Sequence, residues 1–275
     1  MSKLTFPISK KARLANIDPG DTSEVKNKQV AKQEVEKYLK QIYDLHYTMY
    51  AENKHSMAII LQGIDASGKD GVVRHICSGL NPQGYKVYSF KRPSDIEIAH
   101  DYLWRIHNVM PVHGEIAICN RSHYEEVTVV KVHPQHLEPQ HLPSDALIKD
   151  IFKQRYRQIN DFERMLSENG THVVKLFLHI SKDEQKKRLE DRLNDRTKHW
   201  KFSEADVIER RHWDTYMEAF EDMLDETNTK YAPWYVIPAD NKWYRDYMVS
   251  RILLETLESF KMKFPASKPN HVKIV

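Results

Sequence analysis

The chain has few of the features that mark secreted or membrane-spanning proteins. Only two of its 275 residues are cysteines, Cys77 and Cys119, and they form neither a C-x-x-C motif nor a metal-ligand pair. A secreted disulfide framework is therefore not expected, and both thiols are expected inside a core. No apolar run approaches the roughly 20 residues that a bilayer span needs. Residues 1–14 lack the apolar stretch of a signal peptide. These absences favour a cytoplasmic protein without membrane contact.

An excess of one charge is also absent. The formal net charge is only +3, although charged residues make up 29% of the chain. Such a balance argues against binding of nucleic acid through a generally basic surface, so any basic region must be local. Hydrophobic residues make up 40% of the chain, which is enough for a sizeable core. The length fits one large α/β domain or two small ones.

Short apolar runs alternate with helical periodicity along the chain. The runs predict strands at residues 56–62, 85–90, 115–119, 172–180 and 234–237. Helices are predicted at residues 26–53, 69–80, 96–109, 145–169 and 243–262. Two more are predicted inside 182–227, with a break near 200–203 and Ser203 as N-cap. This order predicts an α/β fold, with a parallel five-stranded sheet sandwiched by helices and ligands at the carboxyl ends of the strands.

The first predicted strand runs into a phosphate-binding pattern. Gly63-x-x-x-x-Gly68-Lys69 matches the P-loop up to its last position. The glycines let backbone N–H groups face phosphate oxygens, the following helix adds its positive N-terminus, and Lys69 adds a cation. Because the pattern lies between a predicted strand and a predicted helix, it indicates a phosphate site rather than a chance glycine-rich turn. The residues of this segment expected at phosphate are Gly63, Ala66, Ser67, Gly68, Asp70 and Arg74.

The last P-loop position departs from the usual Ser or Thr, because it is Asp70. The hydroxyl that normally holds Mg²⁺ is missing there, and Ser67, one residue before Gly68, cannot simply replace it. Asp65 offers a carboxylate within the loop. We hypothesise that Asp65 binds Mg²⁺ or orients the accepting phosphate. The alternative is that Asp65 only accepts hydrogen bonds from loop amides.

A second group of polar residues follows the third predicted strand. P-loop enzymes usually carry an Asp at such a strand end, near Mg²⁺, but this chain has Asn120. A neutral amide is a poor ligand for a hard cation beside a carboxylate, so we expect Asp65 to carry more of the metal binding. Arg121 is expected to neutralise charge on the transferring group. The alternative for Arg121 is a structural ion pair.

Three segments together resemble a known family. They are Gly63-Ile-Asp-Ala-Ser-Gly-Lys-Asp-Gly71, Asn120-Arg-Ser-His-Tyr-Glu-Glu-Val127 and Ala232-Pro-Trp-Tyr-Val-Ile-Pro-Ala-Asp-Asn-Lys-Trp243. In this order they are similar to the nucleotide-phosphorylating polyphosphate kinases of family 2, from about residue 30 to residue 262. The Asn-Arg-Ser-His-Tyr form resembles class III of that family.

The resemblance implies a P-loop kinase fold and an activity. Inorganic polyphosphate would phosphorylate AMP and ADP reversibly, with Mg²⁺ or alternatively Mn²⁺ as the metal, adenine as the base and guanine as a second candidate. A homo-oligomer, often a tetramer, is also implied. The catalytic residues would be Asp65, Lys69 and Arg121, with Asp65 as metal ligand. The nucleotide-binding residues would be Asn120, Tyr124 and Glu125.

The resemblance also implies a helical lid rich in Lys and Arg. We divide the chain into residues 1–55, a leader with an amphipathic helix, and residues 56–275, a kinase core that includes a lid segment at about 182–213. Arg188, Arg192 and Lys201 are the lid residues expected at phosphate. The alternative is an exposed helix with surface ion pairs.

Two other functions stay open at this stage. An ATP-dependent nucleoside monophosphate kinase of thymidylate-kinase type would share the loop, the lid and the fold. A non-catalytic nucleotide- or polyphosphate-binding regulator would bind without transfer. The presence of Lys69, Asp65 and Arg121 together argues against the regulator. The histidines form no H-x-x-x-H pair, and we do not expect zinc.

Overall fold

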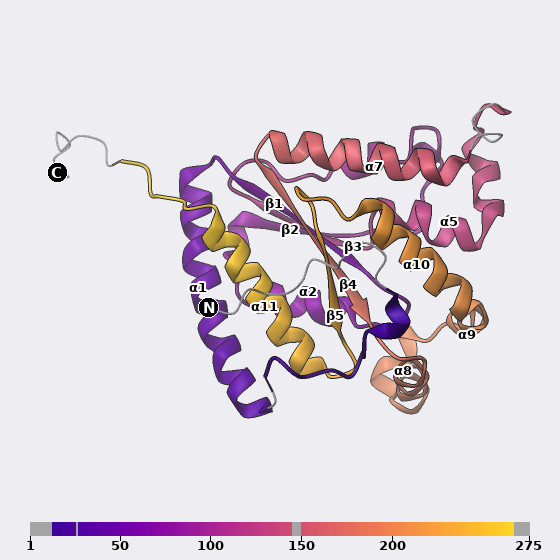
Figure 1. The fold of residues 1–275 in the computed structure, drawn as a ribbon, viewed down its shortest axis with the longest axis horizontal. Coiled ribbons are helices and arrows are strands. Elements are labelled where there is room, and N and C mark those ends of the chain that lie inside the picture. The colour runs from indigo at the N-terminus through magenta and orange to yellow at the C-terminus, as the bar shows by residue number, and fades with distance from the viewer. Residues whose placement is uncertain (1–12, 26, 145–149, 267–275) are drawn as a thin grey trace.

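The computed structural model describes residues 13–25, 27–144 and 150–266, which contain a five-stranded parallel sheet (Figure 1). The strand order is β2-β3-β1-β4-β5. The strands are β1 (Ser56–Gln62), β2 (Tyr85–Ser89), β3 (Ile116–Asn120), β4 (Thr171–His179) and β5 (Trp234–Pro238). The predicted α/β fold is confirmed, and each strand lies within one residue of its predicted bounds.

The centre of the sheet determines where the two polar loops meet. β1 is buried along its whole length, as expected of a parallel strand covered on both faces. It pairs with β3 in a register that places Leu61 opposite Asn120. The backbone N–H of Arg121 then donates to the carbonyl oxygen of Leu61 at 3.1 Å. The loops that follow β1 and β3 therefore leave the same edge of the sheet side by side.

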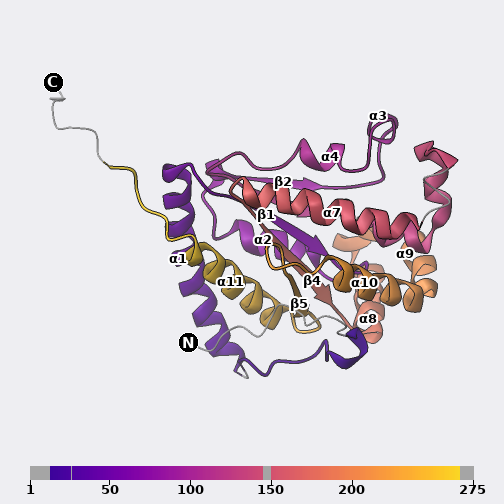
Figure 2. The ribbon, with the colours of Figure 1, turned by 45° about the horizontal axis from the view of Figure 1, so that its top comes forward.

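Helices cover both faces of the sheet (Figure 2). The longer ones are α1 (Lys28–Glu52), α2 (Lys69–Cys77), α7 (Ile151–Glu168), α8 (Lys182–Asn194), α10 (Trp213–Thr227) and α11 (Lys242–Ser259). The shorter ones are α3 (Asp95–Ile98), α4 (Trp104–His107), α5 (Val129–Val132) and α9 (Glu204–Glu209). α11 packs on α1 and α2, whereas α7 contacts β4 and α10 on the other face.

The single helix predicted at 96–109 is wrong. Residues 96–109 form two short helices, α3 and α4, rather than one. Ser94 starts α3 with a capping box, and the Asp101 side chain accepts the N–H of Leu103 at 3.0 Å just before α4. Such hydrogen bonds between side chains and the nearby backbone compete with the formation of one continuous helix. The start of the helix predicted at 145–169 lies outside the described residues, and its described part is α7.

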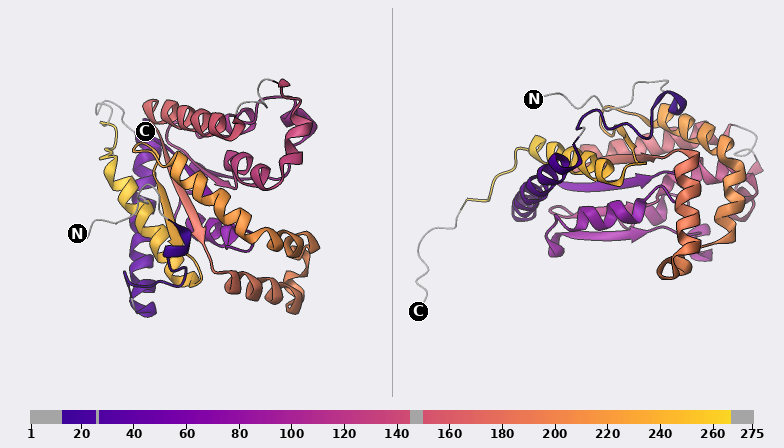
Figure 3. Two further views of the ribbon diagram at one scale, coloured as in Figure 1. Left: turned by 45° about the vertical axis from the view of Figure 1, so that its right-hand side comes forward. Right: turned by 90° about the horizontal axis from the view of Figure 1, so that it is seen from below.

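The break predicted near 200–203 is confirmed, but the segment after it forms two helices, α9 and α10, rather than the single predicted helix. α8 ends at Asn194, and α9 begins after Ser203, whose Oγ accepts the N–H of Ala205 at 3.2 Å. α8, α9 and the start of α10 project past the carboxyl ends of the strands (Figure 3). None of the helices within the described ranges is long and apolar enough to cross a membrane.

The described part of the leader contacts the core. Leu14 is 1% exposed, and its N–H donates to Glu221 Oε1 at 2.8 Å. The N–H of Asp240, just after β5, donates to the carbonyl oxygen of Pro19 at 3.1 Å. α1 packs along α11. Contacts thus cross the boundary that the sequence places at residue 55, and that boundary stays a prediction.

A buried ion pair links β4 to α7. Lys175 and Glu163 are both fully buried, and Lys175 Nζ donates to Glu163 Oε2 at 2.7 Å. The ammonium also donates to the Tyr124 hydroxyl at 2.9 Å and to the Thr227 carbonyl oxygen at 2.7 Å. Burial is the largest influence and acts to raise the pKa of Glu163, but the contacts with Lys175 and His123 together outweigh it and hold that pKa below its ordinary value. The pair satisfies two charges that could not be buried alone.

Replacing one partner should therefore destabilise the protein strongly. Lys175→Met leaves the Glu163 carboxylate buried without its cation, and we expect a loss of about 3–5 kcal/mol in the free energy of unfolding. Urea unfolding followed by tryptophan fluorescence measures it. The control is Lys153→Met on α7, the helix that also carries Glu163. The ion pair that this variant removes, between Lys153 and Asp150, is exposed. It should cost under about 1 kcal/mol. Equal losses in the two variants would contradict the interpretation.

Candidate active site

The loop after β1 has the backbone conformation of an anion-binding turn. Gly63 and Gly68 have φ angles of 143° and 105°, and Ala66 has a φ of 62°. A Cβ at Gly63 would lie 2.6 Å from the carbonyl oxygen of Leu178, so the position requires glycine. The loop runs into the N-terminus of α2, where backbone N–H groups have no partner within the helix and can bind an anion.

Lys69, the first residue of α2, folds back against this loop. Its Nζ donates to the carbonyl oxygens of Gly63 at 2.6 Å and of Ile64 at 3.2 Å, and the residue is only 8% exposed. Burial, with the nearby Arg121 guanidinium, lowers the pKa of Lys69 to about 8. A phosphate group beside this ammonium would favour its charged form.

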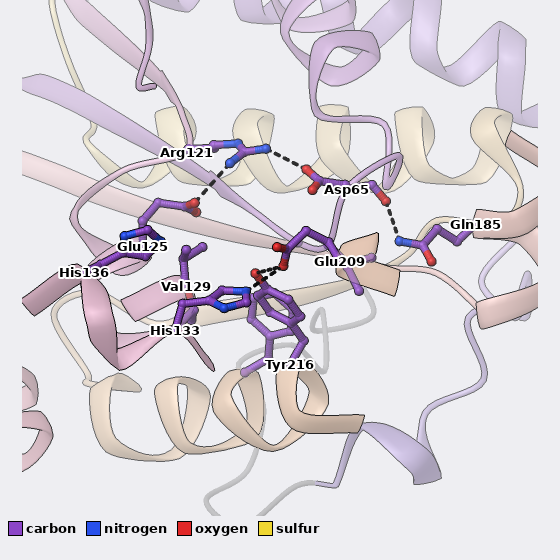
Figure 4. Close-up of a pocket in the computed structure, with 13 residues that line it drawn as sticks. Asp65, Arg121, Glu125, Val129, His133, His136, Gln185, Glu209 and Tyr216 are labelled. Atoms are coloured by element: carbon purple, nitrogen blue, oxygen red, sulfur yellow. Dashed lines mark hydrogen bonds and ion pairs between the residues drawn. The ribbon is translucent and has the colours of Figure 1, made fainter. Parts of the chain in front are cut away.

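Arg121 joins the two loops. Its Nη2 donates to Asp65 Oδ1 at 2.6 Å and its Nη1 to Glu125 Oε2 at 3.2 Å (Figure 4). The carboxylates, Glu125 foremost, outweigh partial burial and raise the pKa of Arg121. Arg121 also has a φ of 65°, a conformation that costs a non-glycine residue about 1–3 kcal/mol and is concentrated at functional sites. The sequence-predicted trio of Asp65, Lys69 and Arg121 is thus brought together.

A small cavity of about 150 Å³ opens on one side of Asp65 and Arg121 (Figure 4). Its far wall carries Glu209, whose Oε2 accepts the Tyr216 hydroxyl at 2.8 Å and lies 2.9 Å from His133 Nε2. Burial and then this hydrogen bond raise the pKa of Tyr216, so its hydroxyl stays protonated. The wall combines rings with hydrogen-bonding groups, which suits a flat heteroaromatic ligand.

A larger cleft of about 1270 Å³ lies on the other side of the same pair. Eleven Lys and Arg residues line it: Lys69, Arg74, Lys91, Arg92, Arg121, Arg188, Arg192, Lys198, Lys201, Lys242 and Arg245. The loop residues Ala66, Ser67 and Gly68 line it too. A nearly neutral chain therefore gathers its cations locally, and such a cleft suits a long polyanion.

Arg188 lies in this cleft but is committed to the protein. It is 8% exposed, and its Nε donates to Glu184 Oε1 at 2.8 Å. Its Nη1 donates to the carbonyl oxygens of Ala66 and Ser67 at 3.0 and 2.8 Å. Its Nη2 donates to those of Ala239 and Asp240 at 2.6 and 3.2 Å. In this structure the guanidinium of Arg188 therefore holds the phosphate loop through hydrogen bonds to its carbonyl oxygens and has no N–H group left for a ligand.

The other two lid cations are paired with single carboxylates. Arg192 Nη1 donates to Asp206 Oδ2 at 2.8 Å, and Lys201 Nζ donates to Asp70 Oδ2 at 2.7 Å. Asp70 Oδ1 accepts Nδ2 of Asn120 at 2.9 Å. The Lys201 hydrogen bond foremost, and then Asn120, lower the pKa of Asp70 despite its partial burial. The Lys201 contact ties the lid segment to the start of α2, whereas the Arg192–Asp206 pair lies within the lid segment.

Tyr124 is the predicted nucleotide-binding residue that the structure does not bring to either cavity. It is fully buried, and its hydroxyl donates to Glu163 Oε1 at 2.7 Å. The side chain points into the core because the short helical turn after Ser122 directs it toward α7, while Glu125 reaches the cavity.

Several residues that line the two cavities come from distant segments and were not predicted from the sequence. Lys242 and Arg245 on α11 line the large cleft, and a Cβ at Gly68 would lie 2.5 Å from Arg245 Nη1. His133, Glu209 and Tyr216 line the small cavity. α11 begins just after β5, so the rule that ligands bind at carboxyl strand ends could have indicated Lys242. No comparable signal marks Glu209.

The donor set fits a hard divalent cation. Within the described part of the chain, no group of three or more His, Cys, Asp or Glu side chains could hold a metal ion. Asp65 and Asp70 supply carboxylate oxygens beside the phosphate loop. Mg²⁺ is commonly bound by one or two carboxylates together with substrate phosphates rather than by an all-protein cage. The residues therefore fit a metal that arrives with, and is completed by, a phosphate ligand.

Two sequence comparisons agree with this geometry. The profile of the polyphosphate kinase 2 family matches residues 25–265. An AMP/ADP-polyphosphate phosphotransferase of Meiothermus ruber is 45% identical over 276 residues, which cover 100% of this chain and 99% of that protein. An ADP-polyphosphate phosphotransferase of Rhodopseudomonas palustris is 47% identical over 232 residues, which cover 84% of this chain and 80% of that protein.

The fold agrees as well. The crystal structure of polyphosphate kinase 2 from Arthrobacter aurescens TC1 matches with a TM-score of 0.89 and 36% identity, covering 96% of this chain and 91% of that chain. The resemblance inferred from the three sequence segments is thereby confirmed. With the family profile spanning most of its length, the chain belongs to the polyphosphate kinase 2 family.

Proposed function

We propose that the protein transfers terminal phosphoryl groups from inorganic polyphosphate to AMP and ADP, reversibly. The observation that carries the proposal is the Arg121–Asp65 pair, which lines both a large cationic cleft and a small cavity with aromatic walls. The names of the relatives from Meiothermus ruber and Rhodopseudomonas palustris support polyphosphate as the second substrate and AMP and ADP as the nucleotides.

We assign one substrate to each cavity. Polyphosphate would lie in the large cleft, with its reacting end over the loop of Gly63 to Lys69. The nucleoside would lie in the small cavity, with its base near Tyr216 and its phosphate near Arg121. Donor and acceptor phosphates would then meet beside Asp65, the residue that lines both cavities together with Arg121.

The chemistry needs charge compensation more than a base. An oxygen of the nucleotide phosphate, already an anion, attacks the terminal phosphorus of polyphosphate, and the shortened polyphosphate leaves with the bond electrons. The obstacle is repulsion between two anions. Lys69, Arg121 and the loop N–H groups lower this cost while they hold the reacting groups in line. The lid segment would exclude water and limit hydrolysis.

A divalent metal would supply further compensation. The family generally uses one, and we propose Mg²⁺, with Mn²⁺ as a substitute, because the donors available are carboxylate oxygens. Bound metal would neutralise charge on the transferring phosphoryl group. Asp65 would orient Arg121 and the acceptor phosphate, and its carboxylate, like that of Asp70, lines the cleft beside the loop.

The donor distinguishes this function from the alternatives. Purified protein with Mg²⁺, polyphosphate and AMP, but no ATP, should form ADP and then ATP. The reason is that the cationic cleft can bind a polyanion as the phosphoryl donor. Anion-exchange chromatography measures the products. An ATP-dependent monophosphate kinase would form nothing until ATP is added, and a binding regulator would form nothing with either donor.

Asp65→Asn should lower turnover by about 10²–10³-fold, because Arg121 loses the carboxylate that orients it at the transferring group. Single-turnover transfer from polyphosphate to ADP measures the chemical step. Asp214→Asn, at an exposed position of α10, is the matched control and should keep wild-type turnover. Near-normal transfer by Asp65→Asn would exclude both its positioning role and a role in metal binding.

Replacement of Arg188 and replacement of Arg192 by Met should affect the protein differently. Arg188→Met removes donors to four backbone carbonyl oxygens and should lower the free energy of unfolding by about 2–4 kcal/mol. Arg192→Met should cost under about 1 kcal/mol and should mainly raise KM for polyphosphate. Urea unfolding and steady-state kinetics separate the two effects. Wild-type stability in Arg188→Met with a raised KM would instead make Arg188 a phosphate ligand.

Assembly into a homo-oligomer, which the family resemblance implies, stays a prediction. Light scattering on the protein as it elutes from a size-exclusion column would measure the mass of the particle, which can be compared with the 32.5 kDa of one chain.

A further inference from the structure

The polar side chains that line the small cavity fall into two groups. Beside the phosphate loop, Arg121 donates to Asp65 at 2.6 Å and to Glu125 at 3.2 Å. These charged groups suit the phosphate of the nucleotide. On the far wall, Glu209 faces the cavity from the last position of α9, which belongs to the lid segment (Figure 4). This is the wall at which the nucleobase would lie.

The two carboxylate oxygens of Glu209 have different surroundings. Oε2 accepts the Tyr216 hydroxyl at 2.8 Å and lies 2.9 Å from His133 Nε2. Because a carboxylate can only accept, both partners donate to it, and together they fill the acceptor positions of that oxygen. Oε1 has no hydrogen-bond partner among the described residues, and the side chain is 31% exposed. Glu209 is therefore held in place through one oxygen and presents the other as an acceptor.

We propose that Oε1 of Glu209 accepts a hydrogen bond from the 6-amino group of adenine, and that Glu209 thereby sets a preference for adenine over other purines. This inference rests on the proposed function and deepens it, because it names the residue that recognises the base.

The chemistry of the purines supports adenine at this position. Adenine carries a donor, the amino group, at position 6, whereas guanine and hypoxanthine carry an oxygen there, which is an acceptor. An acceptor placed against a carboxylate oxygen is repelled and leaves both groups without a partner. Guanine could offer its N1–H and 2-amino groups only to two accepting oxygens side by side. Since Oε2 of Glu209 is already filled, guanine would not find such a pair.

Other side chains of this wall discriminate less between bases. Gln185 is committed to the protein, since its Nε2 donates to the carbonyl oxygen of Asp65 at 3.1 Å and its Oε1 accepts Arg210 Nη1 at 2.8 Å. The rings of Tyr216 and Phe220, whose centroids lie 5.9 Å apart, offer apolar surface to any purine. His136 also lines the cavity, and a neutral imidazole has one donor and one acceptor nitrogen. The choice of base therefore falls to Glu209.

Wild-type protein and a series of nucleotides test the proposal without any mutation. The series is ADP, GDP, IDP and purine riboside diphosphate, which differs from ADP only by the missing 6-amino group. With polyphosphate as donor, kcat/KM should be about 10- to 100-fold lower for purine riboside diphosphate than for ADP, because a hydrogen bond to a charged group is lost. It should be lower still for IDP and GDP, because their position 6 carries an acceptor.

Glu209→Gln provides the sharpest variant, because it can exchange an acceptor for a donor at the same place. The amide oxygen can still accept from Tyr216 and His133, which leaves the NH₂ group facing the cavity. We expect kcat/KM to fall for ADP and to rise for IDP and GDP, so that the preference for ADP over IDP falls by about 100-fold. Glu204→Gln, at an exposed position of the same helix α9, is the matched control and should keep the wild-type preference.

Three results would overturn the proposal. They are equal kcat/KM for ADP and purine riboside diphosphate in the wild type, an unchanged ADP-to-IDP ratio in Glu209→Gln, and an equal loss for every base in that variant, which would make Glu209 purely structural. Failure of the proposed function would look different, because polyphosphate would then phosphorylate none of these nucleotides. Calorimetric binding of ADP and IDP would in that case still measure the preference.

Discussion

Parallel pairing of β1 with β3 is the constraint on which the site depends. The register that sets Leu61 opposite Asn120, and the backbone bond from Arg121 to Leu61, bring two separate loops to one point. A slip of one residue would turn every side chain of β3 to the other face of the sheet. Arg121 would then lose Asp65. The chemistry is thus positioned by backbone hydrogen bonds deep in the sheet, and the left-handed conformation of Arg121 is held by the same bonds.

Around this point four of the cleft's cations are already paired with the protein's own oxygens. Lys69 is bonded to loop carbonyls, Arg121 to two carboxylates, and Arg192 and Lys201 to one each. At these four cations a phosphate chain would bind by exchanging one set of partners for another. Such exchange avoids the cost of holding unpaired cations in a partly buried cleft, and it explains how a chain with a net charge of only +3 can serve a polyanion.

The fold was predictable because strands that are buried on both faces appear in the sequence as short apolar runs. The contact of Asp65 with Arg121 was predictable because the carboxyl ends of parallel strands lie at the same edge of the sheet. The destinations of long side chains were not. Arg188 was expected at phosphate and instead supports the loop, and Tyr124 was expected at nucleotide and instead reaches Glu163 in the core. These outcomes depend on tertiary neighbours that lie far away in the sequence.

The burial of Lys69 links anion binding to protons. Its pKa lies at about 8 in the structure, below the ordinary value of about 10.4, and an adjacent phosphate would raise it again. Between these two values, binding of a phosphate ligand must be accompanied by proton uptake, so affinity should fall as the solution becomes more alkaline. At neutral pH the ammonium is already mostly protonated, and the protein would bind its anion there without this proton cost.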